Sequence, residues 1–187
     1  MNKIIRRLNL QIDTKRAKEY YFELEKKYQH LKWEVPIGNV TIHAWSIHGI
    51  KGRPYPVPFF VPDSEPAGVE NYYETELVFG WAKDMIDMFP YGYQAGIGSN
   101  PPGTRINAHS DPTSPHMVRL HIPIITNINY TWTTSEGTVH LEAGYAYLVD
   151  TSYHHATINA GSTPRVHFAM CIPRNKICQI EEFLPSV

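Results

Sequence analysis

A strong excess of charge of either sign is absent from this sequence of 187 residues. Seventeen Lys and Arg residues nearly balance eighteen Asp and Glu residues, so the composition gives no electrostatic footprint for a nucleic-acid or membrane-surface partner. Residues 1–21 contain no long apolar run, and we therefore expect neither a secretory signal nor a spanning helix there. No internal repeat or low-complexity tract occurs, which argues against a repeat architecture.

Cysteine is also scarce, with only Cys171 and Cys178. The two thiols could pair, but in an unexported chain they are expected to stay reduced. We therefore expect a cytoplasmic protein without a disulfide. The length suits one domain, residues 1–187, that is large enough to bury a core.

Histidine is the residue type that stands out. The chain has ten histidines, and seven of them fall between His109 and His167. Because histidine is the commonest metal ligand and proton shuttle, this clustering is the first indication of function. Side chains away from the motifs below are assigned to the surface, to the core or to packing: His43, His48, His116, His140 and Trp132.

The first ninety residues carry helical signals. Residues 14–31 have apolar side chains at helical spacing, with Thr14 as the expected N-cap, and residues 71–89 predict a second helix. Residues 39–47 alternate as a strand does. Residues 51–68 contain five prolines, which predict an ordered loop that is either an active-site cover or a structural strap.

From Gly92 onward the sequence changes to short β-type runs separated by Gly, Pro, Asn and Ser. The runs cover residues 93–97, 104–109, 117–125, 130–133, 138–142, 145–149, 154–158 and 165–172. Many short strands at close spacing predict an antiparallel sandwich or barrel. Helices followed by a β-core indicate an α+β domain.

The stretch "NAHSDPTSPH" carries His109 and Asp111, which point to the same side of a strand and can bind one ion together. A third ligand should lie on a neighbouring strand, and "YLVDTSYHHATIN" offers His154 and His155. Two histidines and one carboxylate form the facial triad of non-haem iron oxygenases. Taken alone, however, Asp111 before Pro112 also fits an ordinary turn.

Two later strands each direct an arginine and a histidine to one side. In "HMVRLHIPII" these are Arg119 and His121, and in "RVHFAMCI" they are Arg165 and His167, with hydrophobic residues on the opposite faces. If the polar side faced solvent, this would be an ordinary half-exposed sheet. If it lined a barrel interior, the arginines would need anions there, and a small dicarboxylate would meet that need.

The region from Tyr91 to Ile172 resembles the aspartyl/asparaginyl β-hydroxylase family of Fe(II)- and 2-oxoglutarate-dependent oxygenases. The matching pieces are "PPGTRINAHSD", "RLHIPI", "EAGYAYLVDTSYHHATIN" and "TPRVHFAM", in the order of the family. The resemblance implies a double-stranded β-helix (jelly-roll, cupin-like) core over residues 91–173, with N-terminal helices packed on its outside. Residues 1–90 are then a helical and loop part, and residues 174–187 a tail.

The resemblance also implies the metal ligands. His109 matches the first metal histidine of the family. Asp111 falls where one branch has glycine, and the presence of aspartate makes this sequence similar to the branch of free-proline hydroxylases. The position after Ser152 and the spacing to Arg165 select His155 as the distal ligand, with His154 as its neighbour.

The co-substrate residues follow in the same way. Arg165 matches the residue that pairs with the distal carboxylate of 2-oxoglutarate. Arg119 and His121 match residues that hold the co-substrate near its metal-binding end. Ser99 matches a serine that assists the distal carboxylate.

The resemblance implies an Fe(II)/2-oxoglutarate-dependent dioxygenase. Such an enzyme uses O₂ to hydroxylate a C–H bond of a small-molecule or peptide substrate, here an amino acid or amino-acid residue, and releases succinate and CO₂. The alternative is a non-catalytic cupin-like metal-binding or structural protein. Arg165 and Arg119 discriminate between the two, because a metal-binding cupin alone has no need of buried arginines.

Overall fold

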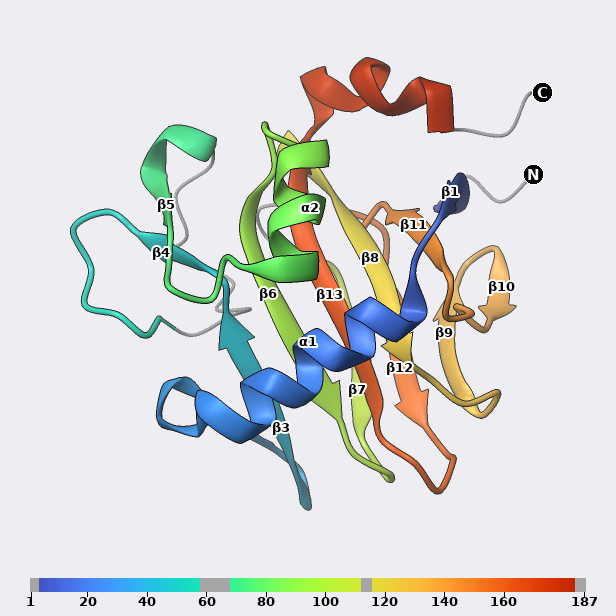
Figure 1. Cartoon of the computed structure of the whole chain (residues 1–187). Helices are drawn as coiled ribbons and strands as arrows, with labels where there is room; N and C mark the ends of the chain where they lie inside the picture. Colours follow the sequence, from blue (N-terminus) through green and yellow to red (C-terminus); the bar gives the residue numbers. More distant parts are fainter. Residues whose placement is uncertain (1–3, 58–67, 112–115, 184–187) are drawn as a thin grey trace.

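The structure, a computed structural model, describes residues 4–57, 68–111 and 116–183 (Figure 1). Its larger sheet has seven antiparallel strands, in the spatial order β1 (Ile5–Gln11), β11 (Tyr145–Val149), β8 (Met117–Ile125), β13 (Arg165–Pro173), β6 (Tyr93–Asn100), β3 (Val40–Ser46) and β2 (Trp33–Ile37). The smaller sheet has four, in the order β10 (Gly137–Val139), β9 (Tyr130–Thr134), β12 (His155–Asn159) and β7 (Arg105–His109). Strands β4 (His48–Ile50) and β5 (Tyr72–Glu74) form a separate pair.

Two helices, α1 (Thr14–Lys27) and α2 (Gly80–Met88), lie across one face of the larger sheet (Figure 1). Short 3-10 helices span Gln29–Leu31, Val69–Asn71 and Arg174–Phe183. The buried side of α1 packs on the sheet, and the Tyr20 hydroxyl donates a hydrogen bond to the Leu77 carbonyl over 2.8 Å. Asp13, and not Thr14, is the N-cap, since its carboxylate accepts from the amides of Lys15 and Arg16.

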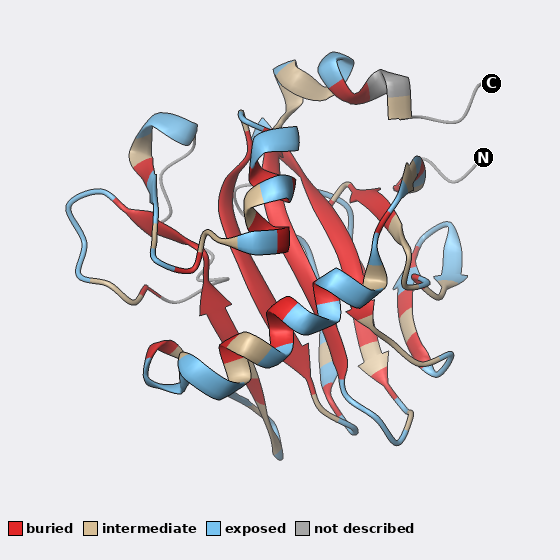
Figure 2. Cartoon of the chain, in the orientation of Figure 1, coloured by how far each residue is buried: buried red, intermediate tan, exposed pale blue. Residues whose placement is uncertain are grey.

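The main hydrophobic core fills the space between the helices and the larger sheet, and Figure 2 shows the central strands of this sheet as buried. Alternation along β8 and β13 produces this core. On β13, Val166 and Phe168 face the helices, where Phe168 contacts Trp81 edge-on at a ring distance of 5.6 Å. Arg165 and His167 point the other way, toward the smaller sheet. The two faces of one buried strand thus carry opposite chemistry.

The predicted α+β fold with a jelly-roll core and outer helices is confirmed. The N-terminal part contributes more to it than helices and loops, because β1, β2 and β3 extend the larger sheet. The prediction of a helix over residues 71–89 is wrong in its first half. Residues 72–74 pair with β4 as a strand, and Thr75 is anchored to the Ile47 carbonyl through its amide and its hydroxyl.

The predicted C-terminal tail and the predicted proline-rich loop can also be compared with the structure. The expected C-terminal tail forms the 3-10 helix from residue 174, and its Ile180 is fully buried in the main core. Of the proline-rich loop 51–68, residues 58–67 lie outside the described residues. Cys171 is buried, Cys178 is exposed, and these two described residues form no disulfide. No described helix is long and apolar enough to cross a membrane.

Candidate metal centre

A cavity that opens to solvent lies between the two sheets. The polar residues that line it come mainly from β7, β8, β12 and β13, together with the segments just after β7 and β11: His109, Asp111, Arg119, His121, Thr151, His155, Thr157, Arg165 and His167. The predicted metal ligands and the predicted arginines therefore share one cavity.

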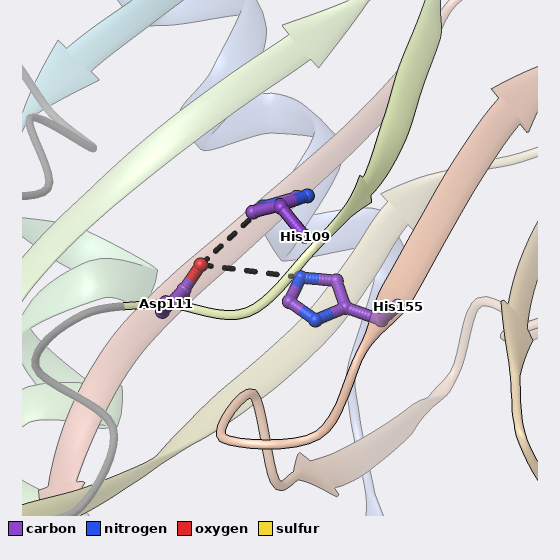
Figure 3. Close-up of side chains that lie close together, drawn as sticks. All are labelled: His109, Asp111 and His155. Atoms are coloured by element: carbon purple, nitrogen blue, oxygen red, sulfur yellow. Dashed lines mark ion pairs between the residues drawn. The ribbon is translucent and has the colours of Figure 1, made fainter.

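His109, Asp111 and His155 converge at one point of this cavity (Figure 3). His109 ends β7 and pairs directly with His155 at the start of β12. The Oδ1 atom of Asp111 lies 3.4 Å from Nε2 of His109 and 4.0 Å from Nε2 of His155. One ligand atom from each residue lies within 4.8 Å of the others, which is near twice a metal–ligand distance of about 2.0–2.2 Å. Small side-chain adjustments would let one ion reach all three.

The two imidazole rings are held in the same way. Nδ1 of His109 lies 2.8 Å from the Asn107 carbonyl oxygen, and Nδ1 of His155 lies 3.0 Å from the Tyr153 carbonyl oxygen. Because a carbonyl only accepts, each Nδ1 carries a proton, and in the neutral ring Nε2 is the unprotonated atom on the side of Asp111. When His109 takes up a second proton, its Nε2 donates a hydrogen bond to Asp111. Both rings therefore present a ligand atom to the same space.

Trp132 of β9 fixes the plane of the distal histidine. Its ring stacks on His155 at 5.4 Å with an interplanar angle of 23°, and it meets His121 edge-on at 5.0 Å. The sequence reading assigned Trp132 to packing. The structure shows that the packing partner is a candidate ligand, which only the pairing of β9 with β12 reveals.

A β-bulge brings β7 into register with the site. His155 pairs with His109, and Thr157 pairs with Ile106. The paired residues are therefore two positions apart on β12 but three positions apart on β7. Without the extra residue, Ile106 and His109 would face opposite sides of the sheet. With it, both side chains line the cavity. Asp111 follows the strand and is tied by its amide to the Thr151 carbonyl over 2.9 Å.

Charge around Asp111 keeps this carboxylate ionised. Its Oδ2 atom accepts a hydrogen bond of 2.7 Å from Nε of the buried Arg119. Burial opposes ionisation of Asp111, but the His109 hydrogen bond and the Arg119 charge outweigh it and hold the pKa well below its usual range. The same hydrogen bond with Asp111 raises the pKa of His109, whereas burial lowers the pKa of His155.

Arg165 lies at the interior end of the cavity and is only 1% exposed. Its guanidinium lies 4.7 Å from the centre of the Tyr130 ring, and Nη1 contacts Nδ1 of His167. Burial lowers the pKa of Arg165 because the charged form is desolvated. Nη2 has no hydrogen-bond partner among the described residues. A buried guanidinium with an unused donor is the feature expected of an anion site.

The histidines beside the arginines are neutral. Burial, followed by the charges of Arg165 and neighbouring cationic groups, lowers the pKa of both His121 and His167 far below the usual range. Their rings lie 5.4 Å apart, and neither nitrogen of His121 has a hydrogen-bond partner among the described residues. Among the described residues that line the cavity, the charged groups are therefore the guanidiniums of Arg119 and Arg165 and the carboxylate of Asp111.

The structure places Ser99, a predicted co-substrate residue, outside the described lining of this cavity. Ser99 pairs with Val166, whose side chain lies in the helix-facing core, and its hydroxyl is hydrogen-bonded to Tyr21 of α1. Directly paired residues of antiparallel strands share a face. Asn100 pairs with Arg165 and lines the cavity instead.

Thr157, like Asn100, is a cavity residue that was not predicted from the sequence. It lies two residues after His155 on β12 and lines the cavity. Its buried hydroxyl has no hydrogen-bond partner in the described part of the chain. The alternation of the strand could have found it, because residues 155 and 157 share one face.

The remaining histidines lie elsewhere. His154 is exposed beside the buried His155, which is the arrangement expected if only the second of the pair points inward. His116 is exposed, and His43 lies 3.9 Å from Glu34 on the outer strands. His48 is buried, and its Nδ1 accepts from the Ala95 amide.

Comparison with known proteins gives one family. Residues 84–175 match the family described as aspartyl/asparaginyl β-hydroxylase, which covers the β-core with the site. Comparison with curated proteins found no match.

Solved structures share the architecture. The non-haem α-ketoglutarate-dependent epimerase SnoN from nogalamycin biosynthesis is 8% identical, with a TM-score of 0.58 over 90% of this chain and 76% of that chain. The viral collagen prolyl hydroxylase of Paramecium bursaria Chlorella virus 1, in its 2OG complex, is 8% identical, with a TM-score of 0.52 over 92% and 96%.

Proposed function

We propose, from the premise that this chain belongs to the aspartyl/asparaginyl β-hydroxylase family, that it is an Fe(II)- and 2-oxoglutarate-dependent dioxygenase. The finer proposal is that it hydroxylates a C–H bond of an amino acid or amino-acid residue and releases succinate and CO₂. We propose further that residues 1–187 act as a single oxygenase domain, since strands of the N-terminal part extend the sheet that carries the site.

One observation carries the proposal. Three candidate ligands, His109, Asp111 and His155, meet in the same cavity as the buried guanidinium of Arg165, whose Nη2 donor is unused among the described residues. A metal alone would need the ligands but not the arginine. A dicarboxylate that bridges the metal and the guanidinium would use both ends of the cavity.

The donor set fits a divalent iron. Two neutral imidazoles and one carboxylate on one side of an ion form the facial triad of Fe(II) oxygenases and leave the other positions open. Arg119 holds Oδ2 of Asp111, which leaves Oδ1 to ligate the metal through one oxygen. The carboxylate also neutralises one of the two metal charges, and the histidines add none while they stay neutral.

The charges around the cavity fit the second ligand. Arg119 and Arg165 contribute two positive charges, and Asp111 offsets one of them before a metal binds. A divalent ion would raise the net charge of the site from about +1 to about +3, and a dianionic co-substrate would bring it back to about +1. In this proposal Arg165 pairs with the distal carboxylate, and Arg119 and His121 lie near the end that binds the metal.

The iron, when bound with the co-substrate, supplies the activation of O₂ that oxidises the C–H bond. The chain orients the ligands through Asn107 and Tyr153, excludes water with the buried ring of Trp132, and holds the dicarboxylate at Arg165. The family description supports an amino-acid side chain as the target, and we favour a small amino-acid-like substrate over a large peptide.

The test is succinate formation by the anaerobically iron-loaded protein, started with O₂ and 2-oxoglutarate, against a panel of free amino acids and short peptides. We expect one member of the panel to raise succinate production and to gain one oxygen atom. His155→Ala should abolish the reaction, while His154→Ala should retain it, because His154 is exposed and points away from the site. Equal loss in both variants would contradict the choice of His155 over His154. No succinate formation with any member of the panel, or metal binding without 2-oxoglutarate affinity, would favour a non-catalytic metal-binding protein.

A further inference from the structure

The turn between β11 and β12 supplies backbone carbonyls to two of the three candidate metal ligands. The Thr151 carbonyl accepts the Asp111 amide over 2.9 Å, and the Tyr153 carbonyl accepts from Nδ1 of His155 at 3.0 Å. Both ligands are thus hydrogen-bonded to the same turn, residues 150–154. A displacement of the turn would change the distance between Asp111 and His155.

Asp150 holds this turn from its first position. Its Oδ1 atom accepts hydrogen bonds from the Ser152 amide at 3.2 Å and the Ser152 hydroxyl at 2.5 Å. An aspartate that binds the backbone two residues further on is a common way to fix a turn. The Asp150 amide donates to the carbonyl of Ile4, the residue before β1, over 2.8 Å.

Arg174 donates hydrogen bonds to the same carboxylate. Its Nη1 donates to Oδ2 of Asp150 at 2.9 Å, and its Nη2 donates to Oδ1 at 2.6 Å and to the Ser152 hydroxyl at 3.3 Å. This is the fork geometry in which arginine and carboxylate bind most specifically. Arg174 directly follows β13, the strand that carries Arg165 at its opposite end.

Neither residue belongs to the cavity wall. Asp150 and Arg174 are absent from the described residues that line the cavity, and their side chains are 17% and 33% exposed. Their hydrogen bonds with each other and with Ser152 connect them to the site through the turn. A pair placed only to stabilise the surface would have no reason to bind the backbone segment that supports two ligands.

We propose that Asp150 and Arg174 form a positioning pair that fixes the turn and thereby sets Asp111 and His155 at the spacing that a metal needs. The effect on a metal rests on the proposed function, whereas the effect on the His155 ring does not. The pair ties the C-terminal segment to the candidate metal centre, so the conformation of residues after β13 is coupled to the ligands.

The first test uses Co(II) alone as the probe, in anaerobic titrations of Asp150→Asn, Arg174→Gln and Arg174→Lys. Loss of an outer hydrogen-bond partner typically weakens metal binding about 10–100-fold, and we expect that loss for the first two variants. Arg174→Lys keeps the charge without the fork, so its loss should be smaller. Asp84→Asn is the matched control, since the Arg16–Asp84 pair of 2.7 Å joins α1 to α2 on the outside.

The control should change Co(II) affinity by less than about twofold, in line with the small effect of exposed ion pairs. Unchanged Co(II) affinity in Asp150→Asn and Arg174→Gln, together with a lower resistance to urea, would overturn the proposal and make the pair a surface clamp.

The second test uses the metal-free protein and reads the histidine ring nitrogens by ¹H–¹⁵N NMR. In the wild type both His109 and His155 should carry the proton on Nδ1. Asp150→Asn should disturb this preference at His155 but not at His109, whose carbonyl partner Asn107 lies on β7. An unchanged His155 signal would overturn the proposal. A wild type that binds no Co(II) would refute the proposed function, and the ring signals would still decide the role of the pair.

Discussion

The two faces of β13 are equally buried but are used in different ways. On the helix side, Phe168 and Met170 fill a close-packed core. On the cavity side, Arg165 and His167 are as inaccessible to water, yet Nη2 of Arg165 has no hydrogen-bond partner in the described chain. The apolar face gains stability from burial, whereas the polar face loses stability unless something binds there. A buried polar group without a hydrogen-bond partner therefore marks the side of the sheet that we assign to ligand binding.

The comparison extends to β8, where Leu120 faces the helices and Arg119 and His121 face the cavity. The same strand thus separates the parts of the chain that hold the fold from those that we assign to ligand binding. Substitutions on one face should change stability and spare binding, and substitutions on the other should do the reverse.

The largest effect is expected on the cavity face. Arg165→Met removes the guanidinium and leaves an apolar side chain in a buried position. Loss of the charged partner of a buried carboxylate costs about 3–5 kcal/mol. The affinity for 2-oxoglutarate should therefore fall by orders of magnitude, while metal affinity stays nearly unchanged and resistance to urea stays equal or increases. Calorimetry with 2-oxoglutarate and urea unfolding measure the two quantities.

The matching change on the helix face is Phe168→Ala. It should lower the free energy of unfolding by about 3–5 kcal/mol, as expected for a large side chain removed from a packed core. The folded fraction should still bind 2-oxoglutarate. A variant at position 165 that loses stability as Phe168→Ala does, but keeps its co-substrate affinity, would contradict the division between the faces and move the binding role to Arg119.

These two faces could be predicted from the sequence because β8 and β13 alternate cleanly. Strand β6 gave no such guide, since all its residues from Tyr93 to Asn100 are buried. Nothing in its pattern tells which face is inward, so the match of Ser99 to a serine of the family could not be checked against the alternation of the strand. A register shift near Ala169 and the positive φ of 51° at Gln94 further break the simple alternation of this strand.

Other differences have a tertiary cause. Residues 72–74 have helical spacing but pair with β4, because contacts between segments distant in sequence override local preference. The bulge in β7 and the stacking of Trp132 on His155 also depend on which strands pair. By contrast, the spacing of His109 and Asp111 predicted that they meet, and the resemblance to the family selected His155 over His154. Strand pairing, which the sequence does not show, supplies the supports of these candidate ligands.

Asp111, on the cavity side, can be tested as a metal ligand. If it is a true ligand, Asp111→Gly should weaken anaerobic Fe(II) binding by roughly 10–100-fold, comparable with the loss seen when a metal-site partner is removed. The fold should remain, because the core residues lie elsewhere. If Asp111 only forms the turn before Pro112, iron affinity should be equal in both proteins. Equal affinities would mean that two histidines suffice, as in the glycine branch of the family.

The pH dependence of metal binding should follow His109. Its pKa is raised by the hydrogen bond with Asp111, and the added proton occupies the Nε2 atom that would ligate the metal. A raised folded-state pKa stabilises the metal-free protein at low pH, and this contribution is lost as pH rises through that pKa. Metal binding depends on pH in the opposite direction, because the proton and the metal compete for the same Nε2 atom. The affinity for Mn(II) should fall with decreasing pH, approaching about one proton per ion below the pKa of His109.

Asp111→Gly provides the control for this titration. It removes the hydrogen bond that raises the pKa of His109, so the fall in Mn(II) affinity should begin at a lower pH than in the wild type. An affinity that is independent of pH through the range where histidine titrates would show that His109 does not ligate the metal.

The smallest effect is expected for Ser99→Ala. Ser99 faces Tyr21 and not the cavity, so 2-oxoglutarate affinity should change by less than about twofold, and the lost hydrogen bond should cost about 1 kcal/mol of stability. Thr157→Val is the matched change on the cavity face, where a buried hydroxyl is removed without loss of shape. It should lower co-substrate affinity by about fivefold. The reverse ranking would return Ser99 to the site.

The most direct test of the central claim is a crystal structure grown without O₂ in the presence of Mn(II) and 2-oxoglutarate, with the ion located by anomalous scattering. We predict one ion at about 2.0–2.3 Å from Nε2 of His109, Nε2 of His155 and a single oxygen of Asp111, with the distal carboxylate of 2-oxoglutarate on Arg165. An ion held by His154, or a dicarboxylate bound away from Arg165, would contradict the account.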